Sequence, residues 1–205
     1  MPIIETITTS FSASGARVLL APWPTATRTG TRVGELDAAR DAVLALHRQP
    51  VIRNLAPRGL DGGKTASTSL VVAERAELII TFLPPECVAG GSVEALAIAA
   101  SRTLMSGGIL AVYTRSEWSR GRLIDPTGPM IAAAQNADLL YLQHIVTLHT
   151  PIRNGRLQPP TATRRIDMAS GERELGAQMM HTRVHGDVLV FAQAHAGAAQ
   201  EEVLR

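Results

Sequence analysis

The sequence predicts an α/β protein built on a doubly wound, mostly parallel sheet of about seven strands with helices on both faces. Short apolar runs of strand length alternate along the chain with segments of helical periodicity, as in successive strand–helix–strand units. Aromatic residues make up only 3% of the chain, so the core must be built from aliphatic side chains. A buried strand pattern over 76–83 ends abruptly at Pro84 and Pro85, which fix the loop that follows.

The length and composition favour one globular domain over 1–205, with an irregular, arginine-containing insertion at about 150–183. The single cysteine, Cys87, excludes an internal disulfide, and we expect a cytoplasmic protein. No apolar run reaches the roughly 18 residues of a membrane-spanning helix, so no membrane partner is expected. The net charge of +2 is too small to indicate a nucleic-acid-binding protein by itself.

Helical periodicity and continuous apolar runs define the elements of the first half. The segment 35–49 has apolar residues at spacings of three and four, with Glu35 and Asp37 in its first turn, where carboxylates favour the helix dipole. The segment 16–21 is an apolar run that ends at Pro22, as a buried strand would. Helices are therefore expected at about 5–11 and 35–49, and strands at 16–21, 51–55, 69–73 and 77–82.

The second half continues the alternation. Ser92 is the expected N-cap of a helix that Gly107 and Gly108 end, and a polar loop is expected over 114–126. Helices are expected at about 92–104, 127–137 and 172–180, and strands at 109–113, 139–149 and 188–192.

The segment 76–86 resembles the strand and catalytic loop of the amino-group DNA methyltransferases, which methylate adenine N6 or cytosine N4. Four further segments resemble parts of the same family in the same order along the chain: 10–20, 33–37, 104–112 and 185–191. The resemblance implies a methyltransferase-like, Rossmann-like sheet whose last strand is antiparallel. It also implies S-adenosylmethionine as the cofactor.

The family's catalytic motif is a polar residue, two prolines and an aromatic residue. The polar side chain and the proline backbone accept hydrogen bonds from the target amine, and the aromatic ring stacks on the flipped base. The matching positions here are Leu83, Pro84, Pro85 and Glu86. Leu83 has no acceptor and Glu86 has no ring, so the resemblance implies a catalytic site that is impaired for this reaction.

The cofactor loop also departs from the family, which has a glycine-rich segment after its first strand. The residues that match this region are Leu20, Ala21, Trp23 and Gly30, and Glu35 matches the acid that holds the cofactor ribose. Two interpretations of Glu35 remain: a ribose ligand, or an acid in the first turn of a helix.

Several other side chains have more than one interpretation. Pro84 and Pro85 are a structural turn, a methyl-transfer loop or a binding loop without chemistry. Cys87 follows the loop, but no base can be placed beside it, and no metal site is predicted. A set of arginines has two interpretations, as contacts to DNA phosphates or as ordinary surface residues: Arg115, Arg120, Arg122, Arg153, Arg156, Arg164 and Arg165.

Three functions follow from these observations. The first is a DNA-methyltransferase-like domain that is impaired in catalysis and has a regulatory or accessory role, binding S-adenosylmethionine, DNA or a partner protein. The second is an active but divergent S-adenosylmethionine-dependent methyltransferase that acts on DNA. The third is a structural or interaction domain without a ligand.

Overall fold

The computed structural model describes residues 2–23, 31–55, 75–87, 91–119, 121–158 and 184–194. Within them the helical elements are α1 (Pro2–Phe11), α2 (Thr31–Ala45), η1 (Pro85–Cys87), α3 (Ser92–Thr103) and α4 (Thr127–Asn136). The main-sheet strands are β1 (Arg17–Ala21), β2 (Gln49–Ile52), β3 (Ala76–Leu83), β4 (Leu104–Thr114), β7 (Leu139–Leu148) and β10 (His185–Gln193). Two short hairpins are β5 (Glu117–Ser119) with β6 (Arg122–Ile124), and β8 (Ile152–Arg153) with β9 (Arg156–Leu157).

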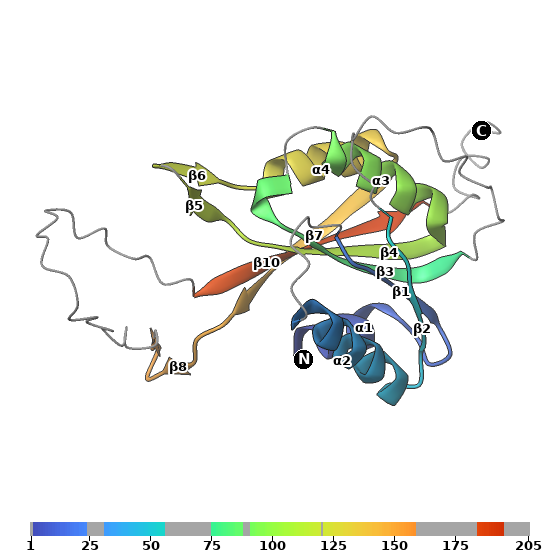
Figure 1. Cartoon of the computed structure of the whole chain (residues 1–205), viewed down its shortest axis with the longest axis horizontal. Coiled ribbons are helices and arrows are strands. Elements are labelled where there is room, and N and C mark those ends of the chain that lie inside the picture. Colours follow the sequence, from blue (N-terminus) through green and yellow to red (C-terminus); the bar gives the residue numbers. More distant parts are fainter. Residues whose placement is uncertain are drawn as a thin grey trace, which may run out of the picture.

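The main sheet has the strand order β2-β1-β3-β4-β10-β7. Strands β2, β1, β3 and β4 pair in parallel, while β10 is antiparallel to both β4 and β7. Helices α1 and α2 cover one face of the sheet, and α3 and α4 cover the other (Figure 1). The doubly wound, mostly parallel sheet with an antiparallel last strand that the sequence predicts is confirmed, with six strands among the described residues.

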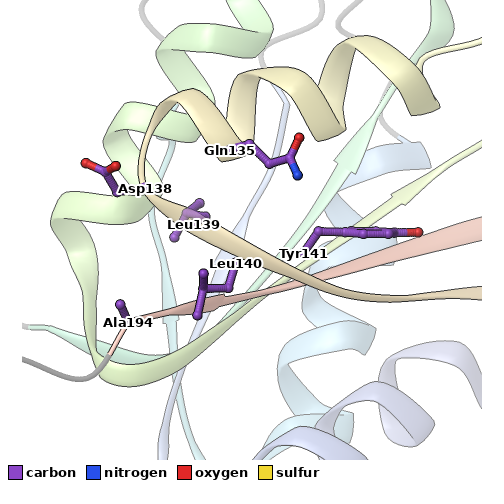
Figure 2. Close-up of a pocket in the computed structure, with 6 residues that line it drawn as sticks. All are labelled: Gln135, Asp138, Leu139, Leu140, Tyr141 and Ala194. Carbon is purple, nitrogen blue, oxygen red and sulfur yellow. The ribbon is translucent and has the colours of Figure 1, made fainter. Parts of the chain in front are cut away.

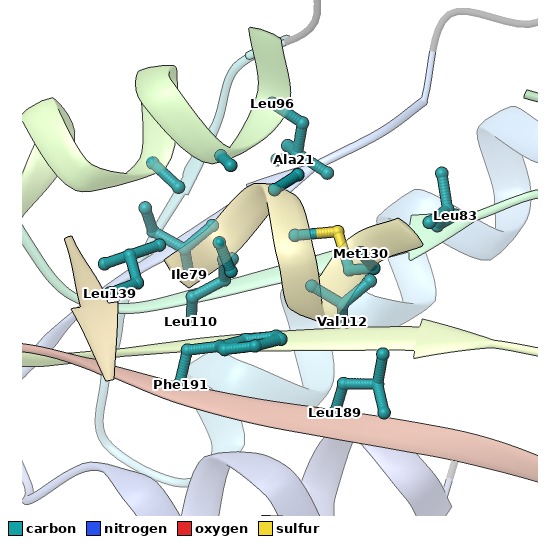
Figure 3. Packing of buried hydrophobic residues seen from close by; sticks show 14 of the residues in the cluster. Ala21, Ile79, Leu83, Leu96, Leu110, Val112, Met130, Leu139, Leu189 and Phe191 are labelled. Carbon is teal, nitrogen blue, oxygen red and sulfur yellow. The ribbon is translucent and has the colours of Figure 1, made fainter. Parts of the chain in front are cut away.

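Two hydrophobic cores lie on opposite faces of the sheet because successive strand residues point to opposite sides. On the α3 and α4 side, Ile79 and Leu83 of β3 pack with Phe191 of β10 (Figure 3). On the α1 and α2 side, Leu78 and Ile80 of β3 pack against helix residues that include Val43. The aliphatic core that the composition predicts is therefore divided between the two faces.

Burial is high in the central strands of the sheet and low in its two edge strands, β2 and β7. Strand β3 has six buried residues among its eight, whereas β7 is buried only at Leu139. On the α1 and α2 side, Val188 and Val190 of β10 belong to the same buried cluster as Ile7 of α1. Strand β10 is therefore covered on both faces, and β7 is left as an exposed edge strand.

Helix α3 differs from its prediction at both ends. Gly91, with a φ of 74°, is its N-cap, and no side chain caps it, so the predicted Ser92 cap is wrong. The helix ends at Thr103, and Gly107 and Gly108 lie inside β4 rather than at a helix terminus. A Cβ on Gly108 would lie 3.1 Å from the carbonyl oxygen of Ala76, so this glycine allows β4 to approach β3.

The remaining differences concern helix boundaries, hairpins and undescribed segments. Helix α2 begins at Thr31 and ends at Ala45, about four residues before the predicted boundaries of 35 and 49. The hairpin β5–β6 lies in the predicted polar loop, and β8–β9 lies at the start of the predicted insertion. The predicted strand at 69–73 and the predicted helix at 172–180 lie outside the described residues.

Candidate functional site

The carboxyl ends of the parallel strands bring together three segments from the sequence analysis. Ala21 at the end of β1 lies beside Thr81 of β3, and Leu83 at the end of β3 lies beside Thr114 at the end of β4. In open α/β sheets this edge is where ligands bind. The edge is therefore the candidate site, and its chemistry depends on which atoms remain available there.

Packing and hydrogen bonds within the fold occupy the groups of the Pro84-Pro85 turn, and we call the turn closed for this reason. The side chain of Leu83 has no solvent exposure and packs in the core on the α3 and α4 side (Figure 3). The Leu83 carbonyl oxygen accepts a hydrogen bond of 2.8 Å from the Thr114 hydroxyl, and the Pro84 carbonyl accepts one of 3.0 Å from the Cys87 amide. The carbonyls of Leu83 and Pro84 therefore each accept a hydrogen bond within the fold.

The last residue of the matched motif is exposed, unlike the first three. Pro84 and Pro85 are buried, whereas Glu86 is exposed in the single turn η1. A carboxylate at this position offers no aromatic face to a base. The structure therefore brings Leu83, Pro84 and Pro85 into the interior and leaves only Glu86 at the surface.

The predicted cofactor residues divide into a buried group and a surface position. Leu20 and Ala21 are each 3% exposed, and the Ala21 carbonyl accepts a 2.8 Å hydrogen bond from the Thr81 hydroxyl. Trp23 is 9% exposed and packs in the same core cluster as Leu83. Glu35 lies on the exposed surface of α2, and Gly30 lies outside the described residues.

The carboxyl end of β2 lies beyond Ile52, where the sequence analysis placed no site residue. Arg53 continues beside β1, with its amide donating to the Leu20 carbonyl at 3.2 Å, and the exposed Asn54 follows. Because polar side chains that follow a strand lie at the ligand-binding edge, Asn54 is a candidate site position that the sequence analysis did not name. The predicted strand at 51–55 was the signal that could have drawn attention to it.

A second missed feature is a paired histidine and aspartate on β7 and β10. His144 Nε2 lies 2.8 Å from an Asp187 carboxylate oxygen, and the Asp187 side chain is only 8% exposed while that of His144 is 36% exposed. A buried carboxylate orients an imidazole in this way in acid–base sites. No local pattern indicates the pair, because the two residues are 43 positions apart.

Asp125 lies close to this pair, at the start of α4. Burial alone would raise the pKa of Asp125, but hydrogen bonds from Thr127 and Ser116, together with the charge of His144, lower it below its usual value of 3.8. The Thr127 amide, at the start of α4, donates to the Asp125 carboxylate at 3.0 Å. Asp125 is therefore held in its ionised form.

Four of the arginines that the sequence analysis singled out are described, and they occupy a loop and two hairpins. Arg115 follows β4 and forms an ion pair of 3.4 Å with Glu117. Arg122 lies on β6, and Arg153 and Arg156 lie on the β8–β9 hairpin. The other three lie outside the described residues: Arg120, Arg164 and Arg165.

A hollow of about 520 Å³ lies at the opposite edge of the sheet. Residues of the turn before β7, the start of β7 and the end of β10 line it, and they include Asp138, Tyr141 and Ala194 (Figure 2). It faces the solvent broadly, and it lies at the amino end of β7, away from the carboxyl edge that holds the Pro84-Pro85 turn. We therefore do not assign the cofactor to it.

Among the described residues, no group of three or more histidine, cysteine, aspartate or glutamate side chains could hold a metal ion. No helix within the described ranges is long and apolar enough to cross a membrane.

No protein-family profile and no curated protein matches the sequence. Solved structures with a similar fold include a putative sarcosine dimethylglycine methyltransferase from Galdieria sulphuraria, with 14% identity over 93% of this chain and 83% of that chain and a TM-score of 0.48. The N-methyltransferase NodS from Bradyrhizobium japonicum WM9 has 10% identity over 95% and 94% of the two chains, with a TM-score of 0.46. A structure titled for the conversion of a disulfide bond into a thioacetal group during echinomycin biosynthesis has 10% identity over 98% and 85%, with a TM-score of 0.50.

These identities are low, so the likeness concerns the fold alone. Together with the sheet order and its one antiparallel strand, it gives the chain a methyltransferase-like fold. The narrower resemblance to amino-group DNA methyltransferases stays a prediction.

Proposed function

We propose that this chain is a methyltransferase-like domain that binds S-adenosylmethionine and does not methylate amino groups of DNA through its Pro84-Pro85 turn. Its role is then regulatory or accessory, through the cofactor, DNA or a partner protein. The single cysteine fits the cytoplasmic location that the sequence analysis expects. Cofactor binding is thus assigned to the carboxyl edge of the sheet, and no methyl transfer is assigned to the turn.

The observation that carries this proposal is the state of the acceptors at the turn. A target amine must find hydrogen-bond acceptors that orient its lone pair toward the methyl group. Here the carbonyls of Leu83 and Pro84 already accept bonds from Thr114 and Cys87. With the Leu83 side chain buried as well, no polar group of the motif's first position reaches a substrate. Loss of such orientation costs about 10²-fold or more in rate.

The cofactor part of the proposal rests on the fold and on the position of Trp23. Trp23 lies two residues beyond the end of β1, where the first strand of such a sheet meets its ligand. Calorimetric titration with S-adenosylmethionine is expected to give saturable heat, and the absence of heat at high micromolar concentration would contradict the proposal. The Trp118→Phe variant removes the exposed tryptophan of β5, so that a ligand-induced change in fluorescence reports on Trp23.

A methyl-transfer assay with labelled cofactor and mixed DNA tests the second part. We expect no transfer to adenine N6 or cytosine N4 above the level of a protein-free control. Transfer that survives Glu86→Ala would show that the chemistry lies at another position of the carboxyl edge. That result would favour the second candidate, an active and divergent methyltransferase, with the His144–Asp187 pair as the acid–base group to test next.

A further inference from the structure

Two aromatic rings lie side by side on the sheet face that α1 and α2 only partly cover. Phe82 and Tyr113 are register neighbours on β3 and β4, and their ring centroids are 5.7 Å apart with an angle of 31° between the planes. Both side chains are partly exposed. At this separation the two rings contact each other at a tilt, and their exposed parts form one aromatic surface.

The backbone of β10 makes room for Tyr113. A Cβ on Gly186 would lie 2.4 Å from the Tyr113 hydroxyl oxygen and 2.8 Å from two ring carbons, so the tyrosine lies directly over the glycine. At its far end the Tyr113 hydroxyl shares a hydrogen bond of 2.8 Å with His149 Nε2. The imidazole stands nearly upright beside the phenol, at an angle of 82° and a centroid distance of 6.3 Å. Phe82, Tyr113 and His149 therefore form a floor with a wall, which we call the aromatic shelf.

Positive charge lies over Phe82 and also follows His149 along the chain. The Arg115 guanidinium lies over the Phe82 ring, with its carbon 5.6 Å from the ring centroid. Beyond His149 the chain enters the β8–β9 hairpin, where Arg153 pairs directly with Arg156 across the two strands.

The hairpin arginines are electrostatically unfavourable where they stand. Like charges directly opposite each other destabilise a strand pair. The segment 149–158 contains no acidic residue, and neither arginine has an ion pair within the described part of the chain. An anionic ligand would relieve this repulsion. Arg115, by contrast, would exchange its exposed Glu117 partner for the ligand, at little cost, because exposed ion pairs contribute little.

We propose that the aromatic shelf binds unpaired bases of single-stranded nucleic acid, with phosphates on Arg115 and on the hairpin arginines Arg153 and Arg156. Flat aromatic surfaces flanked by cations are how proteins hold single strands, because every base has a face that can stack. Bases inside a duplex are already stacked, so duplex DNA cannot use the shelf. The shelf lies on the sheet face opposite the Leu83 side chain, and the proposal goes beyond the cofactor site.

The test is fluorescence anisotropy with a fluorescein-labelled oligothymidylate of about twelve nucleotides and its ribonucleotide counterpart. Phe82→Leu and Tyr113→Leu are each expected to weaken binding by about fivefold or more, the lower end for loss of one base-stacking contact. Tyr113→Phe keeps the ring and is expected to bind as the unaltered protein does. The matched control is Tyr141→Leu, because Tyr141 is the other tyrosine of the chain and packs against Phe191 on the opposite face.

Competition experiments separate a strand from its components. Unlabelled single strand is expected to displace the probe, while thymidine monophosphate and a duplex of the same length are expected to compete at least tenfold less well. The double variant Arg153→Gln, Arg156→Gln is expected to reduce the slope of log affinity against log salt by about 1.4, the value for two phosphate contacts with a single strand.

Three results would overturn the proposal. They are no binding of either oligonucleotide at high micromolar protein, equal binding by the unaltered protein and both leucine variants, and an equal loss in Tyr141→Leu. None of them bears on cofactor binding, which the calorimetric titration measures separately. Thermal unfolding of each variant checks that a loss of binding comes from a folded protein.

Discussion

The Pro84-Pro85 turn and the aromatic shelf begin on adjacent residues of β3, yet they differ in what they offer to a ligand. Leu83 points into the core on the α3 and α4 side, and its carbonyl is held by Thr114. Phe82 points to the other face, where its neighbour Tyr113 reaches the exposed His149. One strand therefore ends in a closed turn on one face and in an accessible ring on the other.

The comparison teaches that a recognisable motif and an available site are separate properties. The turn carries the resemblance in the sequence, but packing and hydrogen bonds occupy its groups. The shelf has no sequence motif, because its rings come from β3 and β4 and its wall follows β7. Substitutions in the turn and in the aromatic shelf test this difference.

The largest effect is expected from rebuilding the family motif at the closed turn. Leu83→Asn places an amide in a site with no solvent exposure and removes a buried leucine. The lost packing and the unsatisfied amide together should lower the free energy of unfolding by about 4 kcal/mol in urea denaturation. Glu86→Tyr, at the exposed position of the same turn, is the control and should change it by less than about 0.5 kcal/mol. A stable Leu83→Asn protein would mean that the turn is open.

A smaller effect is expected at the floor of the shelf. Gly186→Ala introduces a methyl group that must displace Tyr113, and such overpacking costs about 1–3 kcal/mol. Oligonucleotide binding should fall with it. Gly128→Ala is the control, because nothing lies within 4 Å of its added Cβ and alanine favours the helix by about 0.5–1 kcal/mol. If Gly186→Ala left both stability and binding unchanged, Tyr113 would not lie over the glycine.

Removing the bond that closes the turn should have a more modest effect. Thr114→Val keeps the side-chain volume but leaves the buried Leu83 carbonyl without its 2.8 Å donor. We expect a loss of about 1 kcal/mol in the free energy of unfolding. Ser101→Ala is the comparison, since its exposed hydroxyl also donates to a backbone carbonyl, that of Ile98, and its loss should be close to neutral. Equal effects would show that the Thr114 bond contributes nothing beyond an exposed one.

The smallest effect is expected when the pH is lowered, at Asp125 in the loop before α4. Because the folded-state pKa of Asp125 lies below 3.8, its ionised form stabilises the protein above pH 3.8, and this contribution is lost as the pH falls through the lowered value. Melting temperatures of the unaltered protein and Asp125→Asn should therefore converge as the pH is lowered from 6 to 2.5. A constant difference across that range would contradict the lowered pKa.

The sequence was most informative where apolar pattern alone determines structure. The strands at 77–82 and 188–192 and the helix at 127–137 were predicted within a few residues, because continuous apolar runs and helical spacing are local signals. Gly107 and Gly108 misled the prediction, since glycine ends helices but also permits close approach within a sheet.

The candidate site was predictable only in part, because register across strands decides it. The apolar side chain of Leu83 was enough to predict that the motif lacks its side-chain acceptor. The hydrogen bond to the Leu83 carbonyl could not be predicted, because its donor, Thr114, is 31 residues away. His144 lies on β7, and the partner that holds it, Asp187, comes from the neighbouring strand β10. No local pattern encodes such pairs.

The position of β10 has a consequence for how the molecule folds. This strand comes last in sequence among those described, yet it lies between β4 and β7, and it alone pairs with β7. Its pairing with β4 joins residues about 75 positions apart, such as Asp187 and Thr114, and closing a loop of that size is slow compared with local contacts. The β2-β1-β3-β4 portion can assemble first, and β7 must wait for β10. The histidine wall of the aromatic shelf is therefore among the last parts of the protein to form.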